Sequence, residues 1–199
     1  MQGKMSSIVS RLLIVSFMLM NLLFFTSCDS PEGDGYSIIL EPIQKFFDAE
    51  GPTQAVGGNS EQMLAQTLTL ERDGNLTGIY LPIGCTNGTL EIEIRNVEDG
   101  LPGSTLLAKN TYDASGIRSE VGTFERFHFP KVSVTAGQRL SFVLKNESGS
   151  CGLSRGLAGD LYTEGDAFFD ARPNAPGWRP LTIGTGIHDL VFLMVLEMK

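Results

Sequence analysis

Short alternating stretches separated by turn residues constrain the fold of this chain more than any other feature of its sequence. The clearest one, TLEIEIRN at residues 89–96, alternates apolar side chains with polar or charged ones. Alternation with a period of two is typical of a β-strand that has one buried and one solvated face. The turn residues of DGLPG (99–103) follow, and a second strand is expected from Thr105 to Tyr112. The stretch from Thr89 to Tyr112 therefore predicts a β-hairpin on which the other strands pack.

Strand-like stretches recur along the rest of the chain, at 36–40, 66–70, 76–83, 124–134, 139–146 and 189–197. The sequence DGN at 73–75 predicts a hairpin between the second and third of these stretches. The fourth should turn Phe127 and Phe129 inward and His128 outward. The last is apolar on both faces, which is typical of a strand in the middle of a sheet.

The remaining segments are expected to be connections. Residues 53–60 and 149–177 are interpreted as loops, and 44–50 as a single helical turn that Gly51 and Pro52 stop. No amphipathic helix of useful length is found. Short strands at near-regular spacing predict an all-β fold, an antiparallel, jelly-roll-like β-sandwich.

Composition limits the domain count and the class of partner. The 199 residues are 42% hydrophobic, which supports one domain with a real core in addition to a leader. The formal net charge is −8, and lysines and arginines form no run along the chain. We therefore expect no nucleic acid as a partner.

The amino terminus has the features of an export signal. Lys4 and Arg11 precede an apolar run at 12–25, which is shorter than the roughly 20 residues that cross a bilayer as a helix. The run ends in FTSC, which resembles the lipobox of bacterial lipoproteins, although Phe25 stands where leucine is usual. The resemblance implies that residues 1–27 are removed and that Cys28 is lipidated. An ordinary signal peptide followed by an incidental cysteine is the alternative.

Residues 28–35 are expected to form a flexible tether, because they contain glycine and proline and have no apolar period. The acidic residues of this segment resemble the export signals of surface-exposed lipoproteins in some Gram-negative groups. In other groups an aspartate directly after the lipidated cysteine implies retention in the inner membrane. We expect a protein that a lipid anchors to a membrane of the cell envelope, with the outer membrane favoured and the face left open.

The segments EIRNVEDGLPGSTLLA (93–108) and VTAGQRLSFVL (134–144) are the most specific parts of a series that covers about residues 66–197. This series resembles a jelly-roll module of bacterial secreted and surface proteins that is commonly treated as carbohydrate-binding-like. The resemblance implies a β-sandwich with a ligand-binding role. No catalytic residue belongs to that module.

Two cysteines, Cys85 and Cys151, remain after removal of the leader and lipidation. Each is expected in a loop just after a strand, in a compartment that permits disulfides. We expect a disulfide between them, with two separate buried thiols as the alternative.

The sequence GLSRG at 152–156 matches the G-x-S-x-G nucleophile elbow of α/β-hydrolases. The residues that would complete the Ser, Asp, His order are Asp160, Asp166 or Asp170, and then His188. The elbow needs a serine between a strand and a helix in a parallel sheet, and neither the helix nor that sheet is predicted. We therefore expect no enzyme activity, and a serine-dependent esterase is a minor alternative.

The segment 149–177 is also acidic, with carboxylates at Asp160, Glu164, Asp166 and Asp170. Calcium takes carboxylate oxygens as ligands, but the spacing does not fit an EF-hand loop. A solvated acidic loop is the more common outcome. We expect no cofactor, and structural calcium is a weak alternative.

Trp178 is the only tryptophan of the chain. An aromatic face can stack on the apolar face of a sugar ring, while charged side chains bind its hydroxyl groups. The candidate ligand-binding residues are Tyr162, Asp160, Asp166, Trp178 and Arg179. The alternative is that Trp178 closes one end of the core.

The sequence therefore predicts a signal peptide (1–27), a lipidated tether (28–35), a lead-in strand and loop (36–65) and a β-sandwich domain (66–199). The expected function is non-catalytic binding by a membrane-anchored envelope lipoprotein, with glycans as the first candidate ligand. A structural subunit that docks to other envelope proteins is the main alternative.

Overall fold

The computed structural model describes residues 37–41, 51–172 and 174–198. These residues are all-β, with short 3-10 turns at Gly58–Ser60 and Ala114–Gly116. The strands are β1 (Ser37–Glu41), β2 (Thr53–Gly57), β3 (Gln62–Thr69), β4 (Gly74–Asn87), β5 (Thr89–Glu98), β6 (Leu101–Asp113), β7 (Phe124–Val134), β8 (Arg139–Lys145), β9 (Ser150–Ser154), β10 (Ala167–Ala171), β11 (Ala175–Pro180), β12 (Thr182–Ile183), β13 (Gly186–Ile187) and β14 (Leu193–Met198). In this described part, no helix is long and apolar enough to cross a membrane. The helical turn expected at 44–50 lies outside the described residues.

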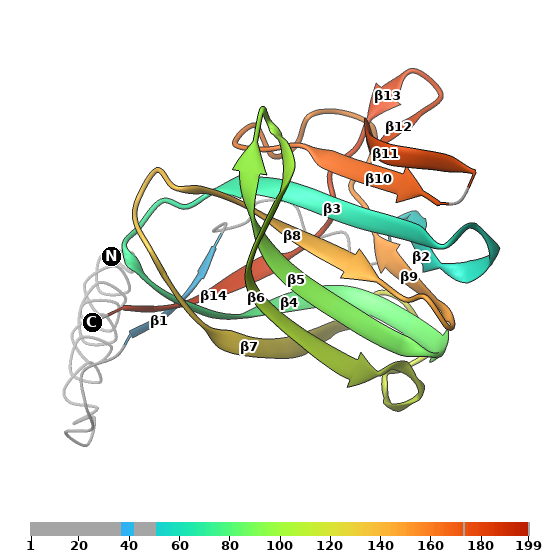
Figure 1. The fold of residues 1–199 in the computed structure, drawn as a ribbon, viewed down its shortest axis with the longest axis horizontal. Coiled ribbons are helices and arrows are strands. Elements are labelled where there is room, and N and C mark those ends of the chain that lie inside the picture. The colour runs from blue at the N-terminus through green and yellow to red at the C-terminus, as the bar shows by residue number, and fades with distance from the viewer. Residues whose placement is uncertain (1–36, 42–50, 173, 199) are drawn as a thin grey trace, which may run out of the picture. The chain divides into compact units, whose positions relative to one another are not determined.

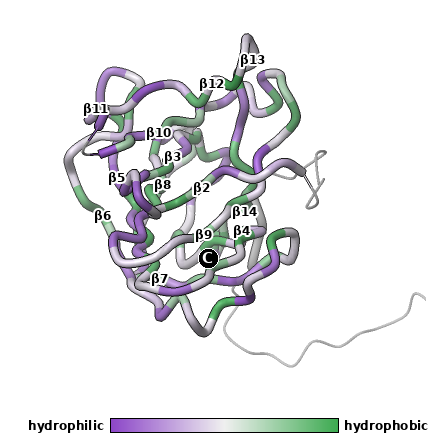
Figure 2. The backbone as a smooth tube through the Cα atoms, turned by 90° about the vertical axis from the view of Figure 1, so that its right-hand side faces the viewer, coloured by the Kyte–Doolittle hydropathy of each residue, from purple (hydrophilic) through white to green (hydrophobic). Residues whose placement is uncertain are grey.

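Most of the strands form one antiparallel sheet that curls into two facing layers (Figure 1). The first layer has the order β1-β14-β4-β7. The second has the order β11-β10-β3-β8-β5-β6. From Ile83 onward β4 pairs with β9 instead, and β2 connects β9 to β3. Figure 2 shows the layers from the side, with β5 and β6 on the left and β14 and β4 to their right. The predicted antiparallel β-sandwich is confirmed.

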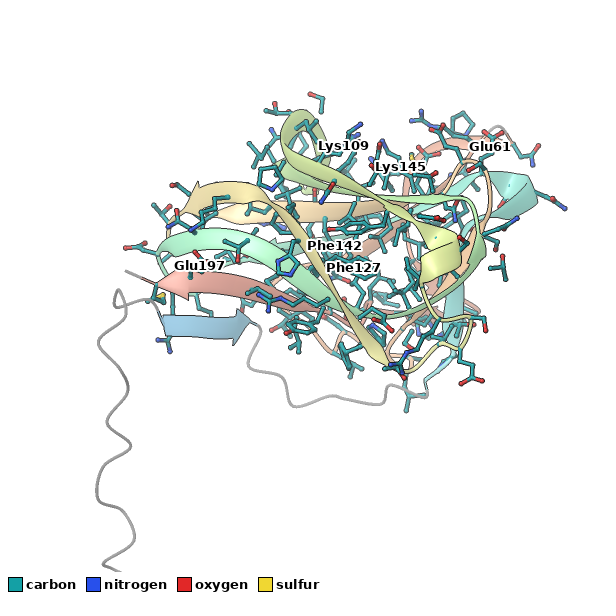
Figure 3. The ribbon with its side chains drawn as sticks, turned by 90° about the horizontal axis from the view of Figure 1, so that it is seen from below. Glu61, Lys109, Phe127, Phe142, Lys145 and Glu197 are labelled. Carbon is teal, nitrogen blue, oxygen red and sulfur yellow. A yellow bond between two sulfur atoms is a disulfide. The ribbon has the colours of Figure 1, made fainter. Side chains whose placement is uncertain are left out.

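The core lies between the two layers. Phe142 of β8 and Phe192 are fully buried, and their rings meet edge to face with centroids 5.1 Å apart. Phe127 of β7 is buried as predicted, and His128 beside it is exposed. Figure 3 shows Phe127 and Phe142 in the interior. The alternation in the sequence therefore assigned the inward and outward faces of β7 correctly.

The hairpin predicted at 89–112 is confirmed, but its turn is shorter than expected. Asp99 and Gly100 alone form the turn, with φ of 52° and 82°, the left-handed conformation that two-residue hairpins favour. Pro102 and Gly103 lie in β6, because Glu98 already pairs with Leu101. The register shifts after Ile94, and the end of the hairpin crosses in front of β8 and β3 (Figure 1).

The hairpin predicted at 73–75 is wrong. β3 and β4 do not pair; they belong to different layers. Their connection runs beside the turn between β7 and β8, where Gly137 N donates to Leu70 O at 2.8 Å and Ala136 N donates to Asp73 Oδ1 at 2.8 Å. Asp-Gly marks a change of direction, and here the chain passes from one layer to the other.

The sheet also includes segments that the sequence analysis interpreted as loops. β2 occupies 53–57, and β3 begins at Gln62, before the expected start of the domain at residue 66. The predicted loop 149–177 contains β9, β10 and part of β11, and 155–166 is its longest described stretch without a strand. β9 was missed because it is short and lacks the alternation of a long strand. It also contains Gly152, which lies opposite Gly84 in the register.

The disulfide between Cys85 and Cys151 is present. The two residues are direct partners in the β4–β9 register, with Cα atoms 4.0 Å apart. They therefore lie within paired strands, and not in loops after strands as expected. The bridge joins the second half of β4, where the chain leaves the first layer, to β9.

Candidate functional site

One face of the second layer points away from the core and is called the outer face here. The charged and aromatic side chains that could bind a ligand lie mainly on this face. One row of register partners crosses it from Glu93 on β5 to Val143 on β8, Ala65 on β3 and Phe168 on β10. Because side chains alternate along a strand, the residues two positions away share this face. The outer face is defined here by Glu91, Glu93 and Arg95 of β5, Ser141, Val143 and Lys145 of β8, Met63, Ala65 and Thr67 of β3, Lys109 of β6, and Phe168, Asp170 and Trp178 of β10 and β11.

Five charged side chains of the outer face form one connected network. Lys145 Nζ lies 3.1 Å from Glu91 Oε1 and 2.7 Å from Glu93 Oε1. Lys109 Nζ lies 2.9 Å from Glu91 Oε2, and Arg95 Nε donates to Glu93 Oε2 at 2.6 Å. Figure 3 shows Lys109 and Lys145 close together at the edge of the molecule. The network leaves carboxylate and ammonium groups side by side in fixed positions.

The network sets the ionisation of Glu91. Burial raises the pKa of this carboxyl group, but the hydrogen bonds with Lys109, Glu93 and Lys145 outweigh burial and lower the pKa to about 2. Glu91 is therefore ionised at neutral pH and presents a hydrogen-bond acceptor. Glu93 is almost fully buried between its two cationic partners.

A small apolar cluster adjoins this network on the same face. Ala65, Val143 and Phe168 are buried apart from the main core, and the half-buried Trp178 packs against them. Trp178 lies on β11. It does not close one end of the main core. The indole ring of Trp178 is therefore held in place by contact with the apolar side chains of Ala65, Val143 and Phe168.

Asp170 adds a buried carboxylate to this end of the outer face. It is opposite Met63 in the register and is fully buried. Its Oδ2 pairs with Arg172 Nε at 3.0 Å, through an arginine side chain that is 57% exposed. Its Oδ1 is buried and has no hydrogen-bond partner within the described part of the chain. A buried acceptor without a donor costs about 1–3 kcal/mol of stability.

The opposite end of the outer face is hollowed. Thr89, Glu91, Lys145, Glu147 and Ser148 line a depression of about 280 Å³ where β5 and β8 meet the turn before β9. A second depression of about 340 Å³ shares Glu147 and Ser148 and lies around that turn. Polar side chains dominate both linings, so these hollows suit a hydroxylated ligand better than an apolar one.

The structure does not bring the five predicted ligand-binding residues together. Tyr162 packs its ring edge to face on Phe192, with centroids 5.5 Å apart, and its hydroxyl group contacts the backbone of Thr69. Arg179 pairs with Phe169 in the register, on the face of β11 opposite to Trp178. Asp160 and Asp166 are exposed in the segment 155–166, which also holds Tyr162. Of the five, only Trp178 lies on the outer face.

A buried carboxylate that the sequence analysis did not single out, Asp189, orders that loop. Its Oδ2 accepts hydrogen bonds from the backbone N–H groups of Leu161 and Tyr162 at 2.9 Å and 3.0 Å. Its Oδ1 accepts from Gln66 Nε2 at 3.1 Å. Burial raises the pKa of Asp189, and these hydrogen bonds oppose the rise. Asp189 is therefore a structural group that ties the loop to β3.

The described geometry gives the G-x-S-x-G match no support. Ser154 is fully buried at the end of β9, and no helix follows it in the described residues. His188 Nδ1 lies 2.8 Å from Arg155 Nη1 and 3.1 Å from Gly156 O. Among the three aspartates of the match, Asp160 and Asp166 are exposed, and Asp170 pairs with Arg172. The arrangement lacks the strand–turn–helix that exposes a nucleophilic serine.

The acidic residues considered for calcium do not form a cluster. Asp160, Glu164 and Asp166 are exposed, and Asp170 is buried in β10. Across the described residues, no group of three or more His, Cys, Asp or Glu side chains is arranged to hold a metal ion.

Sequence reasoning missed most of the outer face. The solvated side of the alternating stretch already contained Glu91, Glu93 and Arg95, which was the available signal. The pairing of β5 with β8, which supplies Lys145 and Val143, joins residues about fifty positions apart and leaves no local trace.

A comparison of the sequence with models of known protein families finds no match, and a comparison with curated proteins finds none either.

Proposed function

We propose that this domain is a non-catalytic binding module and that its outer face binds glycans. The observation that carries the proposal is the position of Trp178, which packs on an apolar cluster of the same outer face that carries a fixed network of carboxylate and ammonium groups. Sugar rings present an apolar face and a rim of hydroxyl groups. An aromatic ring stacks on the first, and charged groups form strong hydrogen bonds with the second.

The experiment is a glycan array probed with the wild type, Trp178→Ala and His128→Ala, followed by titration of each bound glycan. Because Trp178 is the only tryptophan, its fluorescence reports directly on the proposed site. We expect Trp178→Ala to weaken binding at least tenfold. His128→Ala, which changes an exposed side chain on the other layer, should bind like the wild type. A wild type that binds no glycan would overturn the proposal.

The thermal stability of Trp178→Ala is measured on the same sample. Removal of a half-buried indole from a satellite cluster should cost about 1–2 kcal/mol, less than the loss of a fully buried core aromatic. If Trp178→Ala keeps its fold, a loss of glycan binding can be attributed to the missing indole ring. A collapse of the fold would instead identify Trp178 as a core residue.

The same proposal places the domain in the cell envelope, anchored by lipid through Cys28. This residue lies outside the described part of the chain, and the proposal rests on the FTSC sequence after a short apolar run. We expect Cys28→Ser to take up no labelled fatty acid and to leave the membrane fraction. Membrane association that persists in Cys28→Ser, with no label in the wild type, would contradict the anchor.

Docking to another envelope protein is a second candidate function, which the exposed apolar side chains favour. They lie at two places in the described domain, namely Leu101, Leu106 and Leu107 on the β5–β6 hairpin, and Leu157, Ile183 and Ile187 around β12 and β13. A photo-crosslinking residue at position 106 or 157, introduced in cells, tests this function. One specific adduct from position 106 that Leu101→Asp abolishes, or from position 157 that Ile187→Asp abolishes, would support docking.

A further inference from the structure

Arg172 places a guanidinium group next to Trp178, at the β11 edge of the second layer. Arg172 directly follows β10, and its Nε donates to Asp170 Oδ2 at 3.0 Å. Asp170 lies across from Trp178 on the neighbouring strand, because Phe169 pairs with Arg179 one position away. A guanidinium group that is bound to Asp170 is therefore held beside the indole ring.

The pairing of β10 with β11 is irregular at this point. Between two register pairs, Asp170 alone lies opposite residues 176–178 of β11. Gly177, directly before Trp178, has a φ of 102°, in the left-handed region that favours glycine. Extra residues on one strand form a β-bulge, which redirects side chains and is common beside ligand sites.

The ion pair with Asp170 leaves most of the Arg172 guanidinium available. The Arg172 side chain is 57% exposed, and its two Nη groups have no partner within the described residues. Asp170 is fully buried and uses only one of its two oxygens in the pair. Solvent weakens an ion pair with an exposed arginine, so this pair contributes little to stability. Its main effect is to hold the guanidinium group in place.

A carboxylate is the group that fits these free donors best. The planar fork of a guanidinium matches the two oxygens of a carboxylate, and the hydrogen bonds between them are charge-assisted. Trp178 is half-buried, so part of its ring stays open to solvent. A sugar ring that stacks on Trp178 would bring a carboxylate on its rim to Arg172.

From this arrangement we infer that the ligand is an acidic glycan, one that carries a uronic or a sialic acid. The ring of the acidic unit stacks on Trp178, and its carboxylate binds the terminal N–H groups of Arg172. Both contacts are made by side chains that solvent reaches, at one place on the edge of the layer. This inference rests on the glycan-binding function proposed above and names the class of glycan.

The test is calorimetric titration of the full chain in detergent with acidic glycans and their methyl esters, which differ only in the charge of the carboxyl group. Trigalacturonate and sialyllactose are used, together with any acidic glycan that binds on the array. The variants are Arg172→Gln and Arg172→Lys. Arg126→Gln, at an exposed position of β7 in the other layer, makes the same change in net charge and is the control.

Arg172→Lys keeps the experiment decisive if Arg172→Gln does not fold. Arg172→Gln leaves a buried carboxylate without a cation, which can be strongly destabilising. Arg172→Lys keeps a cation near Asp170 but lacks the planar fork. The melting temperature of each variant is measured on the same samples.

We expect at least one acidic glycan to bind at least tenfold more tightly than its methyl ester. Arg172→Gln should abolish this preference, Arg172→Lys should reduce it at least threefold, and Arg126→Gln should keep it. Equal affinity for acid and ester, or a preference unchanged in Arg172→Lys, would overturn the inference. An array on which only neutral glycans bind also overturns it and leaves the proposed function standing, whereas a negative array overturns both.

Discussion

At the scale of single residues, ion pairs hold the charged side chains of the outer face in position. Glu91 accepts hydrogen bonds from Lys109 and Lys145, and Glu93 from Lys145 and Arg95. Arg95 also donates to Gly103 O at 3.3 Å, which holds the bent end of the hairpin. The same side chains therefore fix the shape of the hairpin and supply the polar surface proposed to bind a ligand.

The pH dependence of stability tests the state assigned to Glu91. Its pKa in the folded protein is about 2, below the ordinary value of 4.5. The ionised carboxylate therefore stabilises the fold above about pH 4.5, and this contribution is lost as the pH falls toward 2. We expect the wild type to melt at a higher temperature than Glu91→Gln at pH 7, with a difference that shrinks between pH 4.5 and pH 2. A difference that is constant across this range would contradict the assignment.

At the scale of elements, the irregular segment 155–166 is held by close backbone contact with β3. Thr67 N donates to Asp166 O at 2.9 Å, and a Cβ atom at Gly165 would lie 1.9 Å from Thr67 O. Gly165→Ala should therefore destabilise the fold by about 2 kcal/mol or more, because the backbone must shift. Gly116→Ala is the control, since a Cβ atom there meets nothing within 4 Å. Similar melting temperatures for the two variants would refute this account of the loop.

The β4–β9 pair gives a second prediction at this scale. The Cys85–Cys151 bridge spans a sequence separation of 66 residues, and loop entropy predicts a stabilisation of about 4 kcal/mol. The double variant Cys85→Ala, Cys151→Ala should lose stability of that order in denaturant unfolding. Non-reducing mass spectrometry of the wild type should detect the two peptides linked. Two freely alkylated thiols in protein purified without reductant would show that the bridge does not form.

The elements also show how far the sequence predicts this fold. The strands with regular alternation, such as β5 and β7, were predicted with their inward faces, because period-two alternation depends only on local burial. β2 and β9 were missed, since short strands with glycines carry no such pattern. The turn at 73–75 was recognised, but the partners of the strands on either side of it were not. A turn signal reports a change of direction, and only the three-dimensional packing decides which strands then pair.

At the scale of the whole molecule, the candidate site exists only because distant strands are paired. The row from Glu93 through Val143 and Ala65 to Phe168 combines four segments in an order unrelated to their order in the chain. Sequence reasoning identified Trp178, because it is the only tryptophan of the chain. It grouped Trp178 with Tyr162, a neighbour in sequence whose ring belongs to the main core. Register between strands that are distant in sequence is set by packing, and local patterns do not encode it.

The central claim is that ligand binding takes place on the outer face of the second layer. The most direct measurement is a map of backbone amide chemical shifts in the labelled domain during titration with a glycan that binds on the array. We predict shifts concentrated in β8, β3, β10 and β11, with the Trp178 side-chain N–H among the largest. Shifts confined to β1, β14, β4 and β7, with no change at Trp178, would contradict the claim.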